Sequence, residues 1–135
     1  MPFHWTADSK QRLFTGLGEG QVSYGDVVTL LDVLAGAKAF SYRKLFDVWA
    51  AHCSMTDAEL LTVVAMIRDY HAHEAMGPLA FVATAEQTVK LARLLGALAA
   101  AERPFRVFES PQDARIWLDT DCRRIRRKRH VGNSG

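Results

Sequence analysis

A short apolar run followed within a few residues by a helix-start signal occurs three times in this chain, and this alternation limits the possible folds. The signals are capping boxes, or a serine followed by proline, which begin helices by accepting backbone N–H groups. The three pairs are Tyr42 to Val48 with Thr56-x-x-Glu59, Leu79 to Ala83 with Thr84-x-x-Gln87, and Pro104 to Phe108 with Ser110-Pro111. Strands that alternate with helices predict an α/β domain with a parallel sheet.

The first 36 residues are expected to add a hairpin and a helix. Their β-prone runs, on either side of a polar loop at 8–11, are Phe3 to Thr6 and Arg12 to Leu17. Alternate glycines at 16, 18 and 20 are then expected to loosen the chain. Ser23 predicts the cap of a helix from Tyr24 to about Gly36.

Helical periodicity extends the three later signals into long helices. The first of these helices is expected to end at about His73 and the second near Glu102. The third is expected to continue past Asp121, because Cys122 and Ile125 continue its apolar stripe. The predicted order is β-β-α-β-α-β-α-β-α. This order implies a mixed, mostly parallel sheet of about five strands, with four helices and right-handed crossovers.

Length and charge bound the kind of protein that this chain can be. At 135 residues it is long enough for one domain with its own core. Six of its 17 basic residues lie between Arg123 and Arg129, which leaves 11 basic residues against 15 acidic residues. We predict a mildly acidic domain over residues 1–122 and a flexible basic tail over residues 123–135. This balance argues against nucleic-acid binding as the purpose of the domain.

The sequence shows no targeting, metal-binding or cofactor motif. It has no apolar stretch of about 18 residues, and its first residues do not resemble a signal peptide, so a cytoplasmic location is expected. Two cysteines, Cys53 and Cys122, are expected to be free thiols. His71 and His73 are two positions apart and would lie on different sides of a helix, which disfavours a metal pair.

Several segments resemble the SpoIIAA-like proteins, a branch of the STAS superfamily, the domain shared by sulfate transporters and anti-sigma-factor antagonists. They are Phe3-His-Trp5, Leu34-Ala-Gly-Ala-Lys38, Tyr42-Arg-Lys-Leu-Phe-Asp47, Met55-Thr-Asp-Ala-Glu-Leu60 and Gly96-Ala-Leu-Ala-Ala100. The predicted order and length are also similar to the STAS fold. The resemblance covers about residues 1 to 120 and implies a STAS-like α/β domain.

The resemblance also implies a place for phosphoregulation. In phosphoregulated STAS domains the acceptor hydroxyl lies where the third strand turns into the next helix, just after an aspartate to which Asp47 is similar. Val48 and Trp49 follow here instead of hydroxyl residues, so the candidate acceptors are Ser54 and Thr56. A phosphate there would meet free N–H groups at a helix start. Capping statistics favour the alternative that Thr56 is an N-cap, and Asp47 can equally be a solvated strand end.

The same turn lies where open α/β sheets bind ligands, beyond the carboxyl end of a strand. Trp49 is expected past the strand end, where its ring either lines a crevice with Met55 or covers the end of the sheet. His52 and Cys53 suggest a thiol nucleophile, but neighbouring strand residues point to opposite faces and no third orienting group is present. The candidate contact residues, with no catalytic set, are Asp47, Trp49, His52, Ser54, Met55 and Thr56.

The basic tail is a separate candidate for binding polyanions. Its cations are Arg123, Arg124, Arg126, Arg127, Lys128 and Arg129. The tail offers no aromatic side chain to stack on bases, and only Ile125 to insert into a bilayer. Contact with nucleic acid or an anionic membrane would therefore rest on charge attraction alone, and the alternative is a tail that only aids solubility.

The sequence thus predicts a non-enzymatic, cytoplasmic STAS-like domain that regulates through contacts at residues 47–56. The expected partner is an unidentified protein or small ligand, with a homodimer as a further possibility. One alternative is a carrier or sensor of a small apolar ligand, since the resemblance implies that related folds hold lipids between sheet and helices. A cavity lined by Trp49, Met55 and the helix after residue 56 would favour that alternative. A hydrolase that uses Cys53 is the remaining one.

Overall fold

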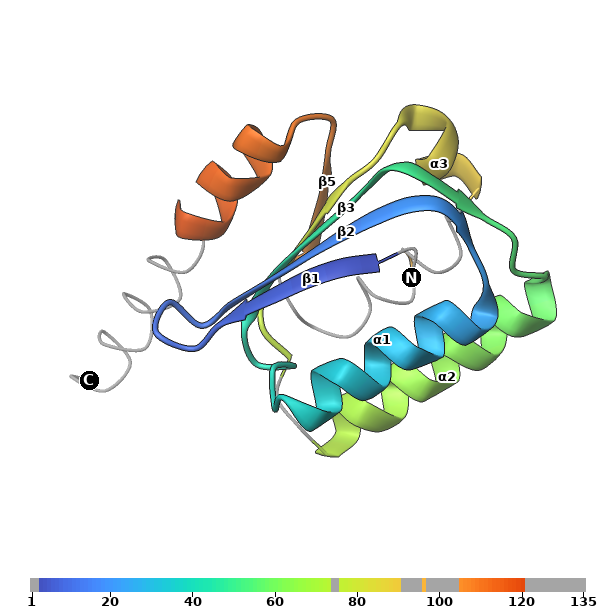
Figure 1. The fold of residues 1–135 in the computed structure, drawn as a ribbon, viewed down its shortest axis with the longest axis horizontal. Coiled ribbons are helices and arrows are strands. Elements are labelled where there is room, and N and C mark those ends of the chain that lie inside the picture. The colour runs from blue at the N-terminus through green and yellow to red at the C-terminus, as the bar shows by residue number, and fades with distance from the viewer. Residues whose placement is uncertain (1–2, 74–75, 91–95, 97–104, 121–135) are drawn as a thin grey trace.

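The computed structural model describes residues 3–73, 76–90, 96 and 105–120 (Figure 1). It contains a five-stranded sheet in the order β1-β2-β3-β4-β5. β1 and β2 pair antiparallel, and the other neighbours pair parallel, so the predicted mixed, mostly parallel sheet is confirmed. The strands are β1 (Phe3–Asp8), β2 (Leu13–Val22), β3 (Arg43–Cys53), β4 (Leu79–Val82) and β5 (Phe105–Phe108).

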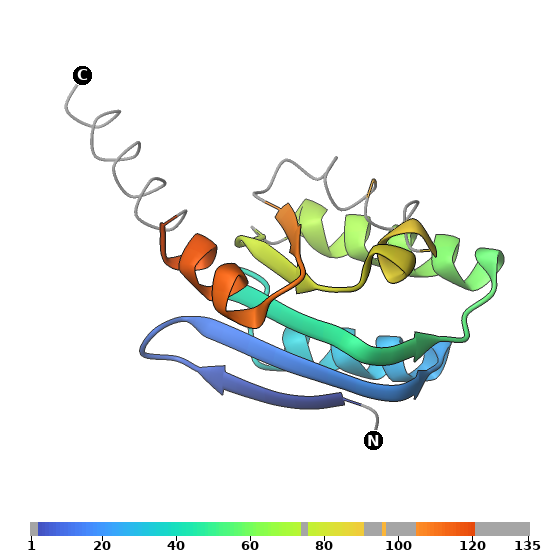
Figure 2. The same ribbon diagram turned by 90° about the horizontal axis from the view of Figure 1, so that it is seen from above.

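The helices cover both faces of this sheet. They are α1 (Tyr24–Gly36), α2 (Asp57–His73), α3 (Ala85–Lys90) and a helix over residues 111–120. α1 and α2 lie side by side against one face, whereas the 111–120 helix lies against the other (Figures 1 and 2). α3 follows the carboxyl end of β4. Among the described residues, no helix is long and apolar enough to cross a membrane.

The two long helices begin at side chains that the sequence marks as caps. Ser23 Oγ accepts a hydrogen bond from the Asp26 N–H at 3.3 Å, and the Asp26 carboxylate accepts one from the Ser23 N–H at 2.9 Å. Thr56 and Glu59 form the same reciprocal pair at the start of α2, at 3.2 and 2.9 Å. These bonds satisfy N–H groups that have no partner within the helix. Both predicted helix starts are confirmed.

The glycines at 16, 18 and 20 lie within the continuous strand β2, so the prediction that they loosen the chain is wrong. Gly16 and Gly18 face the helices on the same side of the sheet, beside the rings of Phe46 and Phe3. A Cβ on Gly16 would lie only 2.8 Å from Cδ1 of Phe46. A glycine inside a strand often marks such a close approach, and here it makes room for large rings on neighbouring strands.

The central strand is longer than predicted. β3 continues past Val48 to Cys53, because it stays paired with β2 as far as Val22 opposite Cys53. Asp47 and Trp49 therefore lie within the strand, and the predictions of a strand end at Asp47 and a turn at Trp49 are wrong. β4, in contrast, pairs with β3 only as far as Asp47, which leaves the last part of β3 open on one side.

Alternating side chains of the sheet form separate apolar clusters on its two faces. On the side of α1 and α2, which we call the cavity face, the central buried residues are Phe14, Phe46 and Leu79, with Leu31, Leu34, Leu60 and Val63 from the helices. On the opposite side, which we call the packed face, Leu13, Leu45, Ala80 and Val82 meet Ala114 and Leu118. The sheet is thus covered on both faces, as the apolar run of β4 predicts.

Some predictions fall on residues that the structure does not describe. They are the extension of α3 towards Glu102, the continuation of the last helix through Cys122 and Ile125, and the boundary and basic tail beyond residue 122. These remain predictions.

Candidate ligand-binding cavity

A cavity of about 360 Å³ lies between the sheet and the helices α1 and α2. The helices contribute six aliphatic side chains to its wall: Val27, Leu30, Leu31, Leu34, Val63 and Ile67. The strands contribute Phe46, Val48, Trp49, Ala51 and Phe81. The wall is therefore apolar over most of its length and is supplied by both layers of the fold.

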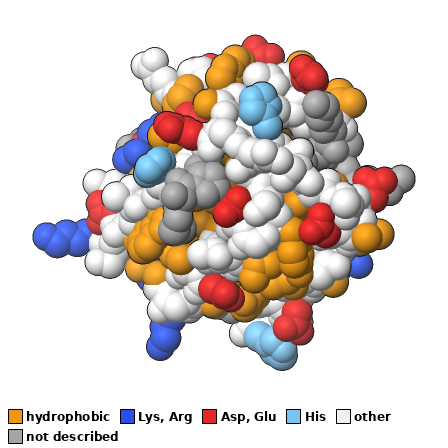
Figure 3. Space-filling model, turned by 45° about the vertical axis from the view of Figure 1, so that its right-hand side comes forward, with side chains coloured by type: hydrophobic (Ala, Val, Ile, Leu, Met, Phe, Trp, Pro, Cys, Tyr) orange, Lys and Arg blue, Asp and Glu red, His pale blue; other side chains and the backbone are white. Residues whose placement is uncertain are grey.

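The cavity has one end that is buried, which we call the closed end, and one end that is exposed, which we call the mouth. Phe40 and Leu79 at the closed end are each 2% exposed, and Lys44 is 1% exposed. At the other end Trp49 is 48% exposed, and His52 is exposed as well. The mouth therefore lies towards the carboxyl end of β3, the end at which α/β sheets usually bind ligands. Figure 3 shows this side of the molecule, with hydrophobic patches lying among acidic side chains.

A β-bulge brings two consecutive side chains of β3 into the cavity wall. The register with β2 shifts so that Val48 and Trp49 stand opposite Gly18 alone. Strict alternation would send one of the two to the packed face, but the extra residue lets both line the cavity. Asp47 supports the bulge, because its Oδ1 accepts a hydrogen bond from the Trp49 N–H at 3.1 Å.

Gln87 of α3 holds the bulge from the other side. Its Nε2 lies within hydrogen-bond distance of three carbonyl oxygens, and its two hydrogens are shared among them: Val48 at 2.6 Å, Trp49 at 3.1 Å and Ala51 at 2.9 Å. Its Oε1 accepts from the Thr84 N–H at 2.7 Å, which completes the predicted capping box. One amide thus satisfies the start of α3 and the irregular backbone at the mouth, where the sheet itself leaves carbonyl groups unpaired.

Lys44 closes the inner end of the cavity with its hydrogen bonds. Its Nζ donates to the carbonyl oxygens of Phe40, Tyr42 at 2.9 Å and Gly77 at 3.5 Å. Gly77 packs so tightly that an added Cβ would lie 2.3 Å from the Tyr42 carbonyl oxygen. The ammonium group therefore joins two loops by their backbone, which is how a buried cation is made tolerable.

The structure brings together only part of the predicted contact set. Trp49, His52 and Met55 line the cavity, while Asp47 supports the bulge. Ser54 Oγ donates to the Val22 carbonyl at 3.1 Å, so it holds β3 against β2. Thr56 Oγ1 accepts from Glu59, as a helix cap does.

Cys53 also lines the mouth, next to His52. β3 is paired regularly with β2 at both positions, with His52 opposite Gln21 and Cys53 opposite Val22. The opposite orientation of the two side chains stays a prediction. Both are exposed, and Cys53 is a free cysteine. Within the described part of the chain, no group of three or more His, Cys, Asp and Glu side chains could hold a metal ion. His73 Nε2 instead lies 3.7 Å from Asp69 Oδ1 on the same helix.

Sequence reasoning missed two residues that build the site. The first is Lys44, although a lysine between apolar neighbours in a strand indicates either an edge or a buried cation. The second is Gln87, for which the sequence predicts only the pairing with Thr84, because its other role depends on a bulge that lies 39 positions earlier in the chain. The alternate glycines of β2 were the available signal for close packing on this face.

Comparison with solved structures identifies a protein of the same fold. It is an uncharacterized protein from the DUF3478 family, from Shewanella loihica PV-4, with a SpoIIAA-like fold. The two chains are 16% identical, the match covers 86% of this chain and 91% of that chain, and the TM-score is 0.60. The predicted SpoIIAA-like fold is thereby confirmed. No protein-family model and no curated protein matches the sequence.

Proposed function

We propose that this protein binds a small apolar molecule between its sheet and helices, and acts as a carrier or sensor of that molecule. The observation that supports the proposal is the cavity of about 360 Å³, which is lined by Trp49, Met55 and α2. This volume falls within the range of roughly 300–1,000 Å³ that is usual for ligand sites. Transfer of apolar ligand surface out of water would supply the affinity, at about 25 cal/mol per Å².

The polar groups around the cavity support binding by shape and apolar contact. The Gln87 amide is occupied by backbone groups, and the Lys44 ammonium donates to carbonyl oxygens. Neither group is arranged to orient a reacting atom. Ligands in such a site are selected chiefly by the fit of their apolar surface, because few directional contacts are offered to them.

The proposal can be tested by filling the cavity. Ile67 is half-buried in the wall, so Ile67→Trp would occupy the space of a ligand. Leu61→Trp is the matched control, because Leu61 lies on the same helix and is 58% exposed. With an apolar fluorescent dye as the probe, we expect Ile67→Trp to weaken binding at least tenfold and Leu61→Trp to leave it unchanged. Equal binding by both variants, each shown to be folded, would overturn the proposal.

A regulatory contact at residues 47–56 is a second proposal. The supporting observation is that Met55 lines the cavity, while its neighbours Ser54 and Thr56 are exposed. A ligand against Met55 would therefore alter the position of a surface segment that a partner can contact. Phosphorylation of Thr56 or Ser54 would act on the same segment, since a phosphate adds charge next to the start of α2.

A further inference from the structure

We propose that the ligand is a single-chain amphiphile, bound with its hydrocarbon tail towards Lys44 and its polar head at the mouth beside His52. This inference rests on the proposed function and specifies its ligand. It follows from three features of the cavity: its elongated wall, the gradient of burial along it and the hydrogen bonds at its closed end.

The shape of the cavity favours a chain over a compact ring system. Its wall includes Lys44 and Cys53, which lie at the two ends of one strand. Because the bulge adds one residue to β3, the span equals eight steps of β2, from Phe14 to Val22, or roughly 26 Å at about 3.3 Å each. The cavity wall is therefore elongated along β3, and a chain can extend from one end of it to the other. A compact molecule of the same volume would fill only part of the length of the cavity and leave the remainder empty.

The size of the cavity sets the length of the chain. Its 360 Å³ corresponds to roughly 12 groups of the size of a water molecule, at about 30 Å³ each. Its length allows at most roughly 20 methylenes, since a zigzag of C–C bonds of about 1.5 Å advances about 1.3 Å per carbon. Chains between these two limits are expected to fit.

The closed end determines which end of the amphiphile enters. A carboxylate placed there would need hydrogen bonds from Lys44, but its Nζ already donates to the carbonyl oxygens of Phe40, Tyr42 and Gly77. The remaining side chains around that end, such as Leu79 and Met76, are apolar. A methyl terminus satisfies this end of the cavity, whereas a polar group would be buried without a partner.

The mouth suits the polar end. His52 is exposed there, as is Glu86 of α3, which also lines the cavity, so a head group beside His52 stays in water. Trp49 is 48% exposed, which places an amphipathic ring at the boundary between the apolar wall and the solvent. Recognition of the head is therefore weak, and the tail supplies most of the affinity.

The first test uses displacement of the dye from the wild-type protein by straight-chain carboxylates of increasing length. Affinity should rise about fourfold per methylene, the factor that corresponds to about 0.8 kcal/mol, and level off once the cavity is full. An adamantane-type carboxylate of equal carbon number is the compact control and should bind at least tenfold more weakly than the chain. Equal affinity for the two shapes would overturn the inference of a chain while leaving the proposed function intact. If the dye itself does not bind, the proposed function fails.

The second test separates the two orientations. A hydroxyl at the far end of the chain should weaken binding about tenfold, because it would be buried without a partner. Replacing the carboxylate head by an alcohol should change the affinity by less than about threefold. The opposite result, with tolerance of the terminal hydroxyl and a large loss on changing the head, would show that the head lies at the closed end.

The third test places a charge at the mouth. His52→Asp should weaken a carboxylate about threefold to tenfold but leave the matching alcohol unchanged, and added salt should reduce the difference. Ala50→Asp is the control, because Ala50 is exposed on the same strand and does not line the cavity. If the two variants affect the carboxylate equally, the head does not lie beside His52.

Discussion

The two faces of the sheet are built from the same five strands but differ in how completely they are filled. On the packed face, Ala114 and Leu118 are both 0% exposed and meet small and medium side chains of the sheet. On the cavity face, α1 and α2 stand over large rings and leave a space of about 360 Å³. We infer that the packed face mainly stabilises the domain, whereas the cavity face gives up some packing to bind a ligand.

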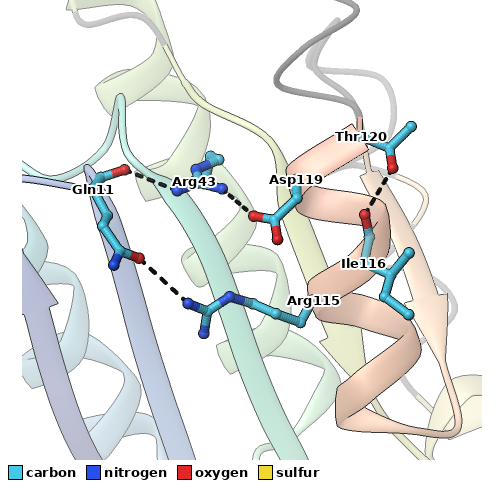
Figure 4. Close-up of polar contacts among 6 residues, drawn as sticks. All are labelled: Gln11, Arg43, Arg115, Ile116, Asp119 and Thr120. Carbon is cyan, nitrogen blue, oxygen red and sulfur yellow. Dashed lines mark hydrogen bonds and ion pairs between the residues drawn. The ribbon is translucent and has the colours of Figure 1, made fainter.

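Polar contacts also hold the packed face together, because they attach the 111–120 helix to the opening hairpin (Figure 4). Arg43 donates to Asp119 Oδ1 at 2.6 Å and to the Gln11 carbonyl oxygen at 2.9 Å. Arg115 reaches the Gln11 side chain at 3.4 Å. The helix is thus held by apolar contacts at its centre and by side-chain contacts at its edge, and the hairpin loop is tied to it.

The largest effect is expected from Leu118→Ala on the packed face. Removal of a fully enclosed leucine should lower the free energy of unfolding by about 2–5 kcal/mol, through lost burial and the cavity left behind. Urea unfolding monitored by circular dichroism measures this loss. Dye binding by the folded variant should stay unchanged, because Leu118 does not line the cavity. If Leu118→Ala weakens dye binding as strongly as Ile67→Trp, the two faces do not have separate roles.

A smaller effect is expected at the start of α2 on the cavity face. Thr56→Ala should cost about 1 kcal/mol of stability, and Thr56→Asp should restore most of it, since aspartate caps well and its charge suits the helix N-terminus. Thermal unfolding of the three proteins measures these differences. Dye binding separates the two proposed roles of Thr56, a helix cap and a phosphorylation site. If Thr56 is only a cap, all three folded proteins should bind the dye with the same affinity. A loss of binding by Thr56→Asp alone would indicate that charge at this segment controls the cavity.

The smallest effect is expected from Asp119→Asn, which removes the charge of the ion pair and little else. Asp119 is about half exposed, so the loss should be only about 0.5 kcal/mol and should shrink in high salt. Denaturant midpoints at low and high ionic strength measure it. A loss close to that of Leu118→Ala would mean that polar attachment, and not packing, holds the packed face.

The sequence is sufficient to predict the fold, because its signals are local. The capping boxes at Thr56 and Thr84 and the cap at Ser23 each act within a few residues, and all three form as predicted. The alternation of short apolar runs with these caps then leaves few ways to build a sheet. Local signals of this kind do not depend on the rest of the chain.

The cavity was predictable only as an alternative, because it depends on distant residues. Trp49 and Met55 were expected to share a crevice, and they do line one cavity. The bulge that admits Trp49 depends on register with β2 and on Gln87, neither of which has a local signature. The empty volume is likewise a property of how far the helices stand from the sheet, which no single segment determines.

The contact between Gln87 and the bulge also affects the order in which the chain can complete its structure during synthesis. The carbonyl groups of Val48, Trp49 and Ala51 emerge from the ribosome well before Gln87, whose two amide hydrogens are shared among all three. Until Gln87 is available, these carbonyl groups must be solvated by water, and the mouth of the cavity cannot take its final form. The unit that ends in α3 is therefore required to complete a site whose walls mostly precede it in the chain.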